Sequence, residues 1–260
     1  MLAALALILC TSCELPAMPY INMDARLVDV ELVLAVDVSG SMDERELALQ
    51  RAGYVEALRH ADFVKAVLSG RRGRIALTYF EWAETIREES VIPWQIIDGP
   101  DSAYNFAAKL ALRSVGGSGG TSISGAVTFG ASLFERNDLE GEKRVIDISG
   151  DGPNNSGIPV DVARDKVVAS GIIINGLPIL VRPARSFEEL DHYYAKCVTG
   201  GPGSFVLPIH AASEFVTAIR HKLILEVSGP IHGSEVVNVK ARQPFDCLAG
   251  EHYRLIYPER

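Results

Sequence analysis

A carboxylate and two hydroxyls follow one apolar segment near the start of the chain, in residues 37–42, Asp-Val-Ser-Gly-Ser-Met. The preceding residues 27–36 predict a β-strand, and the continuous apolar run in its second half is typical of a parallel sheet that is covered on both faces. An Asp at the carboxyl end of such a strand lies where open α/β sheets bind ligands. Hard, neutral hydroxyl oxygens beside a carboxylate suit Mg²⁺. Asp37, Ser39 and Ser41 are therefore candidate metal ligands.

The same residues have a purely structural interpretation. Residues 41–44, Ser-Met-Asp-Glu, fit the capping-box pattern ahead of a helix predicted at about 43–60. Asp37 would then be only a turn former at a strand end, and Ser39 only a loop residue. This segment alone favours helix capping and metal binding equally.

Two distant segments favour the metal. Residues 116–123, Gly-Gly-Ser-Gly-Gly-Thr-Ser-Ile, form a glycine-rich loop that opens a helix, with Thr121 or Ser122 at its N-cap. The predicted strand 144–149 leads into a Gly-Asp-Gly turn that contains Asp151. Each segment could be only a cap or a turn, but together they add a hydroxyl and a second carboxylate. Because strand-to-helix junctions of a parallel sheet share one edge, these groups can converge there.

Five positions of the sequence together resemble a motif of a known family. The pattern resembles the metal-ion-dependent adhesion site of von Willebrand factor A domains, in the order Asp37, Ser39, Ser41, Thr121 and Asp151. The resemblance covers roughly residues 28–225. The segments Gly-Gly-Thr-Ser-Ile and Ile-Ser-Gly-Asp-Gly-Pro-Asn-Asn also resemble a bacterial group of these domains whose function is unknown.

The resemblance implies a chemistry for the site. Both Ser hydroxyls would bind the cation directly, and Thr121 and the two Asp would bind it directly or through water. A shell of neutral hydroxyls and water leaves a dication able to accept a further carboxylate. The implied cofactor is Mg²⁺, with Mn²⁺ or Ca²⁺ as alternatives, and the implied partner is a protein that offers an Asp or Glu carboxylate. The expected function is binding, not catalysis.

The enzymatic alternative is a Mg²⁺-dependent phosphohydrolase that uses Asp37 as its nucleophile. Such enzymes generally carry a second acid two residues later as proton donor, and position 39 is Ser. A nucleophile elbow at Ser118 is disfavoured, because residues 110–113 before it look helical and not like a strand.

The order of predicted elements indicates the fold class. Strands are predicted at 27–37, 75–82, 144–149, 171–177 and 204–208, helices at about 43–60, 101–113, 122–136, 158–169, 186–196 and 211–225, a short apolar turn at 62–68, and an edge strand at 85–91. Strands that alternate with helices predict an α/β fold, doubly wound and Rossmann-like. We expect a mostly parallel sheet with one antiparallel edge strand and helices on both faces. Asn175-Gly176 is interpreted as a turn at a strand end.

Composition fits one such domain with extensions. The chain has 260 residues, of which 48% are hydrophobic and 22% charged, enough apolar material for one core. Its net charge of −8 argues against nucleic acid or an anionic membrane as the main partner. We expect the domain to span 27–225 and the tail 226–260, which contains three Pro, to be an extension packed on it.

The N-terminus predicts export. Residues 2–10 are an unbroken apolar run, too short to span a bilayer as a helix. Residues 1–17 are therefore interpreted as a cleaved signal peptide, although no Lys or Arg precedes the run. Lipidation at Cys13 is the alternative. We expect a periplasmic or extracellular protein with no transmembrane segment after signal removal.

Two cysteines remain after cleavage, Cys197 and Cys247. An even pair in an exported chain suggests a disulfide that pins the C-terminal tail to the domain. Two buried free thiols are the alternative, because connectivity cannot be derived from sequence.

Overall fold

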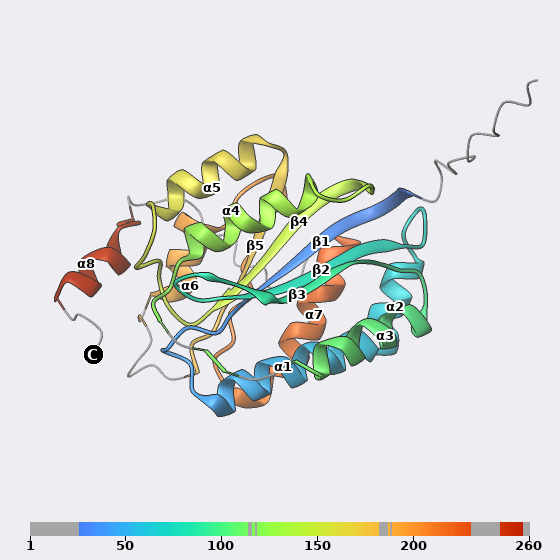
Figure 1. Cartoon of the computed structure of the whole chain (residues 1–260), viewed down its shortest axis with the longest axis horizontal. Helices are drawn as coiled ribbons and strands as arrows, with labels where there is room; N and C mark the ends of the chain where they lie inside the picture. The colour runs from blue at the N-terminus through green and yellow to red at the C-terminus, as the bar shows by residue number, and fades with distance from the viewer. Residues whose placement is uncertain are drawn as a thin grey trace, which may run out of the picture.

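A five-stranded sheet organises the molecule, in the order β3-β2-β1-β4-β5 (Figure 1). The computed structural model describes residues 26–113, 116–117, 119–181, 187, 189–229 and 245–256. The strands are β1 (Leu27–Asp37), β2 (Ile75–Trp82), β3 (Ile86–Ile97), β4 (Glu140–Gly150) and β5 (Ile172–Pro178).

Helices connect these strands. They are α1 (Glu44–Arg59), α2 (Ala61–Leu68), α3 (Pro100–Ala111), α4 (Ile123–Phe134), α5 (Val160–Ala169), α6 (Leu190–Tyr193), the π-helix η2 (Tyr194–Val198), the 3-10 helix η3 (Ala212–Glu214), α7 (Phe215–Ser228) and α8 (Ala249–Ile256).

The sheet is mostly parallel and is built around the central strand β1. It pairs in parallel with β2 on one side and with β4 on the other, and β4 pairs in parallel with β5. Only β3, at the edge, runs antiparallel to its neighbour β2. The connections from β1 to β2 and β3 proceed toward one edge of the sheet. After β3 the chain returns past β2 and β1 to form β4, and the connection to β5 proceeds toward the other edge. The gap between the carboxyl ends of β1 and β4 is therefore a topological switch point, where such sheets bind ligands.

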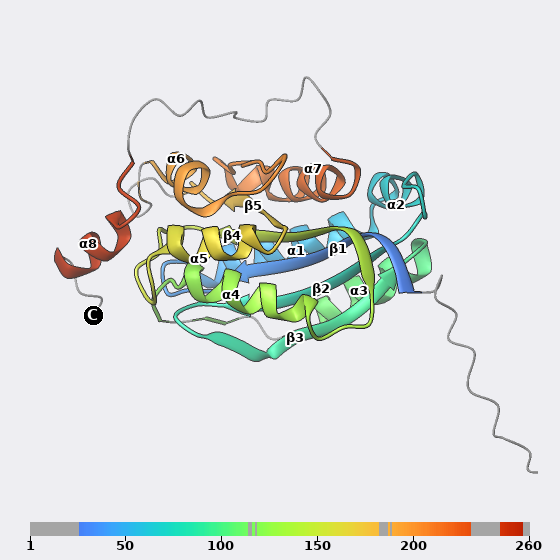
Figure 2. The same ribbon diagram turned by 90° about the horizontal axis from the view of Figure 1, so that it is seen from above.

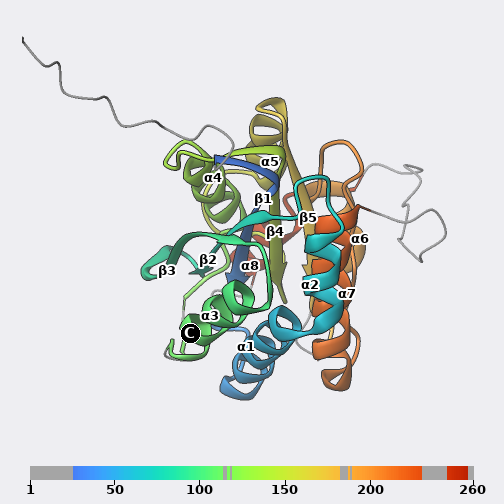
Figure 3. The ribbon, with the colours of Figure 1, turned by 90° about the vertical axis from the view of Figure 1, so that its right-hand side faces the viewer.

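Helices lie on both faces of the sheet (Figures 2 and 3), and each face packs into its own hydrophobic core. In β1, Leu32 and Leu34 face a core shared with α1, α2, α3 and α7. Val33 and Ala35 face a second core that includes residues of α4, α5, α6 and η2. Because successive side chains point to opposite faces, a continuous apolar run fills both cores. The predicted fold class, an α/β doubly wound sheet with one antiparallel edge strand, is confirmed.

Several element boundaries differ from the sequence-based expectation. The edge strand β3 extends through Pro93 to Ile97, since the edge position tolerates a residue without an N–H. The apolar turn predicted at 62–68 is the helix α2, which His60 caps by accepting the Asp62 N–H. The strand predicted at 204–208 is replaced by isolated bridges, one of which joins Val206 to Gly176.

The Asn175-Gly176 pair lies inside β5 and not at its end, so that interpretation was wrong. Asn175 is buried, and its amide oxygen accepts the Phe205 N–H at 2.9 Å. Gly176 is needed for close packing, because a Cβ there would lie 2.7 Å from a ring carbon of Tyr194. Tertiary contacts have thus overridden a local turn signal.

Both ends of the chain are described only in part. The predicted signal peptide 1–17 and Cys13 lie outside the described residues. Of the predicted extension 226–260, the structure describes 226–229 and 245–256, including α8. Across the ranges given above, no helix combines the length and apolar character needed to cross a bilayer.

Candidate metal centre

The carboxyl end of β1 delivers Asp37 into the interior beside the switch point. Asp37 is fully buried, and its Oδ1 accepts the Ser39 backbone N–H at 2.7 Å. Its other oxygen, Oδ2, is buried without a hydrogen-bond partner among the described groups. From α1, Gln50 donates its side-chain amide to the Asp37 carbonyl at 3.0 Å and fixes the strand end. An unsatisfied buried carboxylate oxygen is what a bound cation would neutralise.

Electrostatics at Asp37 follow from this burial. Removal from water raises the pKa of Asp37 to about 8, and the nearby charge of Asp151 acts in the same direction, while hydrogen bonds from Ser39 oppose the shift. No Lys, Arg or His of the described ranges lies within ion-pair distance of Asp37. The carboxyl therefore keeps its proton near neutral pH unless a cation arrives from outside.

Ser39, Ser41 and Asp151 form one hydrogen-bonded group. The two Ser Oγ atoms lie 3.0 Å apart, and Ser41 Oγ donates to Asp151 Oδ1 at 2.5 Å across 110 residues of chain. Ser39 is buried, whereas Ser41 and Asp151 are half-buried. The group is thus closed on the side of Ser39 and faces solvent on the side of Ser41 and Asp151.

The capping interpretation of Ser41 was wrong. The N-cap of α1 is Asp43, whose Oδ1 accepts the Glu46 N–H at 2.9 Å, while Glu46 accepts the Asp43 N–H at 3.1 Å. This is a complete capping box shifted by two residues from the expected one. Ser41 contacts Asp151 instead.

Thr121 lies beside the same loop. It is buried, and its Oγ1 would be 3.6 Å from a Cβ built on Gly152. Its N–H donates to Asn155 Oδ1 at 2.8 Å, and its carbonyl accepts the Asn155 N–H at 2.9 Å. Of the two N-cap candidates for α4, Ser122 is the cap, since its Oγ accepts the Gly125 N–H at 3.3 Å. Hydrogen bonds to its backbone N–H and carbonyl hold Thr121 in place, and its hydroxyl does not cap α4.

Glycines let the loops approach closely. The Gly40 N–H donates to the Gly119 carbonyl at 3.0 Å. A Cβ on Gly117 would lie 1.6 Å from the Val38 carbonyl oxygen, so only glycine fits. Ser118, between these two glycines, lies outside the described residues. The glycine-rich loop that leads into Thr121 therefore packs against the loop that carries Ser39 and Ser41.

The sequence did not single out Tyr194 as a neighbour of the site. A Cβ on Gly150 would lie 2.7 Å from both Asp37 Oδ2 and the Tyr194 hydroxyl, which places both groups beside that glycine. Burial and the negative charge of Asp37 raise the pKa of Tyr194, so its hydroxyl keeps its proton. The rings of Tyr194 and of its neighbour Tyr193 are both buried.

The donor set is rich in hydroxyls. The candidate site offers two carboxylates, Asp37 and Asp151, with the hydroxyls of Ser39, Ser41 and Thr121. Within the described part of the chain, no cluster of three or more His, Cys, Asp or Glu side chains could hold a metal ion. The residues present fit a hard cation that prefers oxygen, since they offer neither thiolate nor imidazole.

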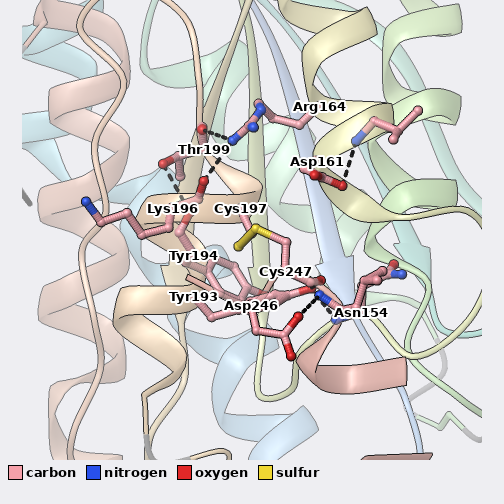
Figure 4. The surroundings of a disulfide bond; sticks show 12 residues. Asn154, Asp161, Arg164, Tyr193, Tyr194, Lys196, Cys197, Thr199, Asp246 and Cys247 are labelled. Carbon is pink, nitrogen blue, oxygen red and sulfur yellow. Dashed lines mark hydrogen bonds between the residues drawn. A yellow bond between two sulfur atoms is a disulfide. The ribbon is translucent and has the colours of Figure 1, made fainter. Parts of the chain in front are cut away.

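The structure joins Cys197 to Cys247 in a disulfide, with 5.5 Å between their Cα atoms (Figure 4). The alternative of two free thiols is thereby excluded in this structure. Cys197 belongs to η2 and is fully buried, and Cys247 lies just before α8. The bond attaches the tail to the domain, as the even cysteine pair suggested.

Solved structures with the same fold come from diverse sources. Proximal thread matrix protein 1 of the mussel byssus, with a zinc-occupied metal-ion-dependent adhesion site, matches with a TM-score of 0.57 at 15% identity, over 77% of this chain and 48% of that one. A von Willebrand factor type A structure from Catenulispora acidiphila matches with a TM-score of 0.52 at 14% identity, over 77% of this chain and 43% of that one. The pilus adhesin SpaC from Lactobacillus rhamnosus GG matches with a TM-score of 0.56 at 13% identity, over 77% of this chain and 31% of that one.

These identities establish the fold alone, and the chain spans less than half the length of each of these structures. No curated protein matches the chain. A family model described as "Protein of unknown function (DUF1194)" matches residues 27–231, from the start of β1 to just beyond α7. The chain has the von Willebrand factor A fold and belongs to the DUF1194 family.

Proposed function

We propose that this protein is an exported, metal-dependent protein-binding module that captures a carboxylate of its partner through a divalent cation. Asp37, Ser39, Ser41, Thr121 and Asp151 would hold the cation, with Mg²⁺ as the first candidate. One observation carries the proposal. Three segments far apart in the sequence bring two carboxylates and three hydroxyls to the switch point, where Asp37 Oδ2 is buried without a partner.

The charges of these residues support a dication. Asp37 and Asp151 together carry two negative charges when ionised, which balance a divalent ion. The three hydroxyls add oxygen ligands without adding charge, so the ion stays electrophilic. Because Ser41 and Asp151 are half-buried while Asp37, Ser39 and Thr121 are buried, the open coordination position would face solvent beside Ser41. A partner's Asp or Glu could reach it there.

Binding fits this site better than hydrolysis. Ser39 occupies the position where a phosphohydrolase would carry its general acid, and a Ser hydroxyl is too weak an acid to protonate the leaving group in that way. The byssus protein, which has the same fold, carries zinc in its metal-ion-dependent adhesion site. This supports a metal at the corresponding residues here, with Zn²⁺ as a further candidate beside Mg²⁺ and Mn²⁺.

Export is part of the proposal. The apolar run 2–10 suits a signal peptide, and a disulfide between Cys197 and Cys247 forms and persists in an oxidising compartment. A periplasmic or extracellular location would expose the candidate metal site to partners outside the cytoplasm.

The proposal is tested by capture from a periplasmic extract. The full chain is immobilised, incubated with extract in Mg²⁺, and eluted with EDTA. We expect a protein that elutes with EDTA, and that is absent when Ser41→Ala is the bait. Ser132→Ala is the matched control, because the Ser132 hydroxyl donates to the Phe129 carbonyl within α4, away from the candidate ligands. Capture that is equal in EDTA, or equal for Ser41→Ala, would contradict the proposal, as would Mg²⁺-dependent phosphatase turnover that is lost in Asp37→Asn.

A further inference from the structure

The C-terminal helix α8 lies at the end of the molecule where the parallel strands finish (Figures 1 and 2). It belongs to residues 245–256, beyond the segment 27–231 that the family model matches. Its contacts are made mainly with the loop that follows β4, which is the loop that carries Asp151.

Two side chains of α8 bind this loop. Glu251 Oε1 accepts the Asn154 side-chain amide at 2.7 Å, and Arg254 Nη1 donates to the Asn155 carbonyl at 3.1 Å. The other guanidinium nitrogen of Arg254 lies 3.1 Å from Glu84 Oε1, at the turn after β2. The helix thus clamps the loop from its outer side.

The backbones also pack closely. A Cβ on Gly250 would lie 2.0 Å from the Asn154 carbonyl oxygen and 3.0 Å from Pro153. Arg254 Nη1 would lie 3.3 Å from a Cβ on Gly120, the residue before Thr121. The helix therefore sits directly on the two loops that frame the candidate metal site.

The inner side of the same loop holds Thr121. Asn155 Oδ1 accepts the Thr121 N–H, and the N–H groups of Asn155 and Ser156 both donate to the Thr121 carbonyl. Asn154 Oδ1 accepts the Ser124 N–H at the start of α4, at 2.9 Å. Each Asn is thus bound by α8 on one side and binds the Thr121 segment on the other.

The disulfide holds α8 in this place. Cys247 precedes the helix and is bonded to Cys197, which is buried in η2. The Tyr193 hydroxyl accepts the Asn154 N–H at 3.1 Å and donates to the Cys247 carbonyl at 3.5 Å (Figure 4). A helix of eight residues is marginal by itself, so its docking depends on this cross-link and on these contacts.

We propose that α8, anchored by the Cys197–Cys247 disulfide, is a positioning element of the metal site, in which Arg254 and Glu251 fix the loop 151–156 and through it Thr121 and Asp151. This inference rests on the proposed function, since it presumes that the site binds a cation. The disulfide and α8 would then affect the metal affinity of the site, whereas a cross-link that only stabilises the fold would not.

Mn²⁺ affinity of the full chain tests the proposal. Titration calorimetry compares the wild type with Arg254→Ala, which keeps the disulfide, and with Cys197→Ala/Cys247→Ala, each at a temperature where circular dichroism shows it folded. Loss of groups that orient metal ligands typically weakens affinity about 10- to 100-fold, and we expect a loss of this size in both variants. Arg113→Ala is the matched control, because Arg113 also binds backbone carbonyls, but those of Glu89 and Val91 on β3 and not those of the loop 151–156.

Two outcomes would overturn the inference. One is an unchanged Mn²⁺ affinity in folded Arg254→Ala, and the other is an equal loss in Arg113→Ala. If the wild type itself binds no Mn²⁺, the proposed function fails, and amide hydrogen exchange then tests the positioning role separately. Faster exchange in residues 119–124 and 151–156 of Arg254→Ala, with no change in the Arg113→Ala protein, would support it, and equal exchange would refute it.

Discussion

Two buried carboxylates on neighbouring strands, Asp37 of β1 and Asp147 of β4, differ in how the protein balances their charge. Both are almost completely removed from solvent. Asp147 Oδ1 lies 2.7 Å from the ammonium of Lys222, which reaches in from α7 and also lies 2.5 Å from Glu226 Oε1. Asp37 has no such cation among the described residues. Within the described residues, the fold supplies a cation to Asp147 and none to Asp37.

Burial shifts the pKa of an ionisable group differently when an oppositely charged side chain lies beside it. Burial alone would lower the pKa of Lys222, but the carboxylates of Asp147 and Glu226 outweigh it and raise that pKa. Burial raises the pKa of Glu226 to about 7, with Lys222 opposing the shift and Asp147 adding to it. The Lys222 cluster is therefore a structural ion network. The Asp37 carboxyl is equally buried but lacks that internal compensation among the described residues.

Removal of Lys222 should have the largest effect on stability. Lys222→Met leaves Asp147 and Glu226 buried without their cation, and breaking a buried ion pair in this way costs about 3–5 kcal/mol. Urea denaturation at pH 8 measures the loss, with Lys65→Met on the exposed side of α2 as the control. A loss below about 1 kcal/mol would show that the cluster is not a structural network.

Neutralising Asp37 should act in the opposite direction. In EDTA at pH 8, Asp37→Asn removes a buried charge that lacks a cation, and we expect the free energy of unfolding to rise by about 1–3 kcal/mol. The same variant should lose the stabilisation that Mg²⁺ gives the wild type, which is about 2.7 kcal/mol at a hundred-fold excess over Kd. A destabilised Asp37→Asn in EDTA would mean that another group already compensates Asp37.

The pH dependence of the metal-free protein should report the same difference. The Asp37 carboxyl has an ordinary pKa of 3.8, raised to about 8 in the folded state. Below pH 3.8 it is protonated in both states, and between these two values the folded state holds a proton that the unfolded state has lost. The free energy of unfolding should therefore fall with rising pH, by at most about 1.4 kcal/mol per unit, and level off above about pH 8.

Thermal unfolding in EDTA from pH 5 to pH 9 checks this dependence. In Asp37→Asn, the free energy of unfolding should fall less steeply with rising pH than in the wild type. Glu226 also makes it fall with rising pH, and this contribution remains in both proteins. Identical pH profiles for the two proteins would contradict the raised pKa of Asp37. Saturating Mg²⁺ should also flatten the wild-type profile, because the cation takes the place of the proton.

The smallest effect is expected at Tyr194. Its hydroxyl is buried without a hydrogen-bond partner among the described groups, although it lies near Asp37. Tyr194→Phe should therefore change the free energy of unfolding by less than about 1 kcal/mol. A larger loss, together with a further rise in the pKa of Asp37, would show that the hydroxyl donates to this carboxylate and partly compensates it.

The sequence predicted the fold and the five candidate ligands from signals that are local. The apolar run of β1 ends at Asp37, and the strand of β4 ends just before Asp151, so a parallel sheet brings both to one edge. The resemblance to the von Willebrand factor A fold is confirmed. The metal itself and the roles of the five ligands stay predictions.

What the sequence could not predict depends on distant contacts. Residues 41–44 and residues 43–46 both fit a capping box. The structure uses 43–46, while Ser41 donates to Asp151, which lies 110 residues later in the chain. The partner of Asp147 lies on α7, where a buried Lys has no local signature. The contacts of α8 with Asn154 and Asn155 depend on a disulfide that sequence alone leaves open.

Titration of Mg²⁺ into the EDTA-treated and desalted full chain tests the central claim most directly. Calorimetry at pH 8 compares the wild type with Asp37→Asn and Asp147→Asn, two identical changes on neighbouring strands. We predict one saturable Mg²⁺ site in the wild type, retained in Asp147→Asn and lost in Asp37→Asn. Equal affinity in Asp37→Asn and the wild type, or no binding by the wild type, would contradict the claim that Asp37 binds a cation from outside.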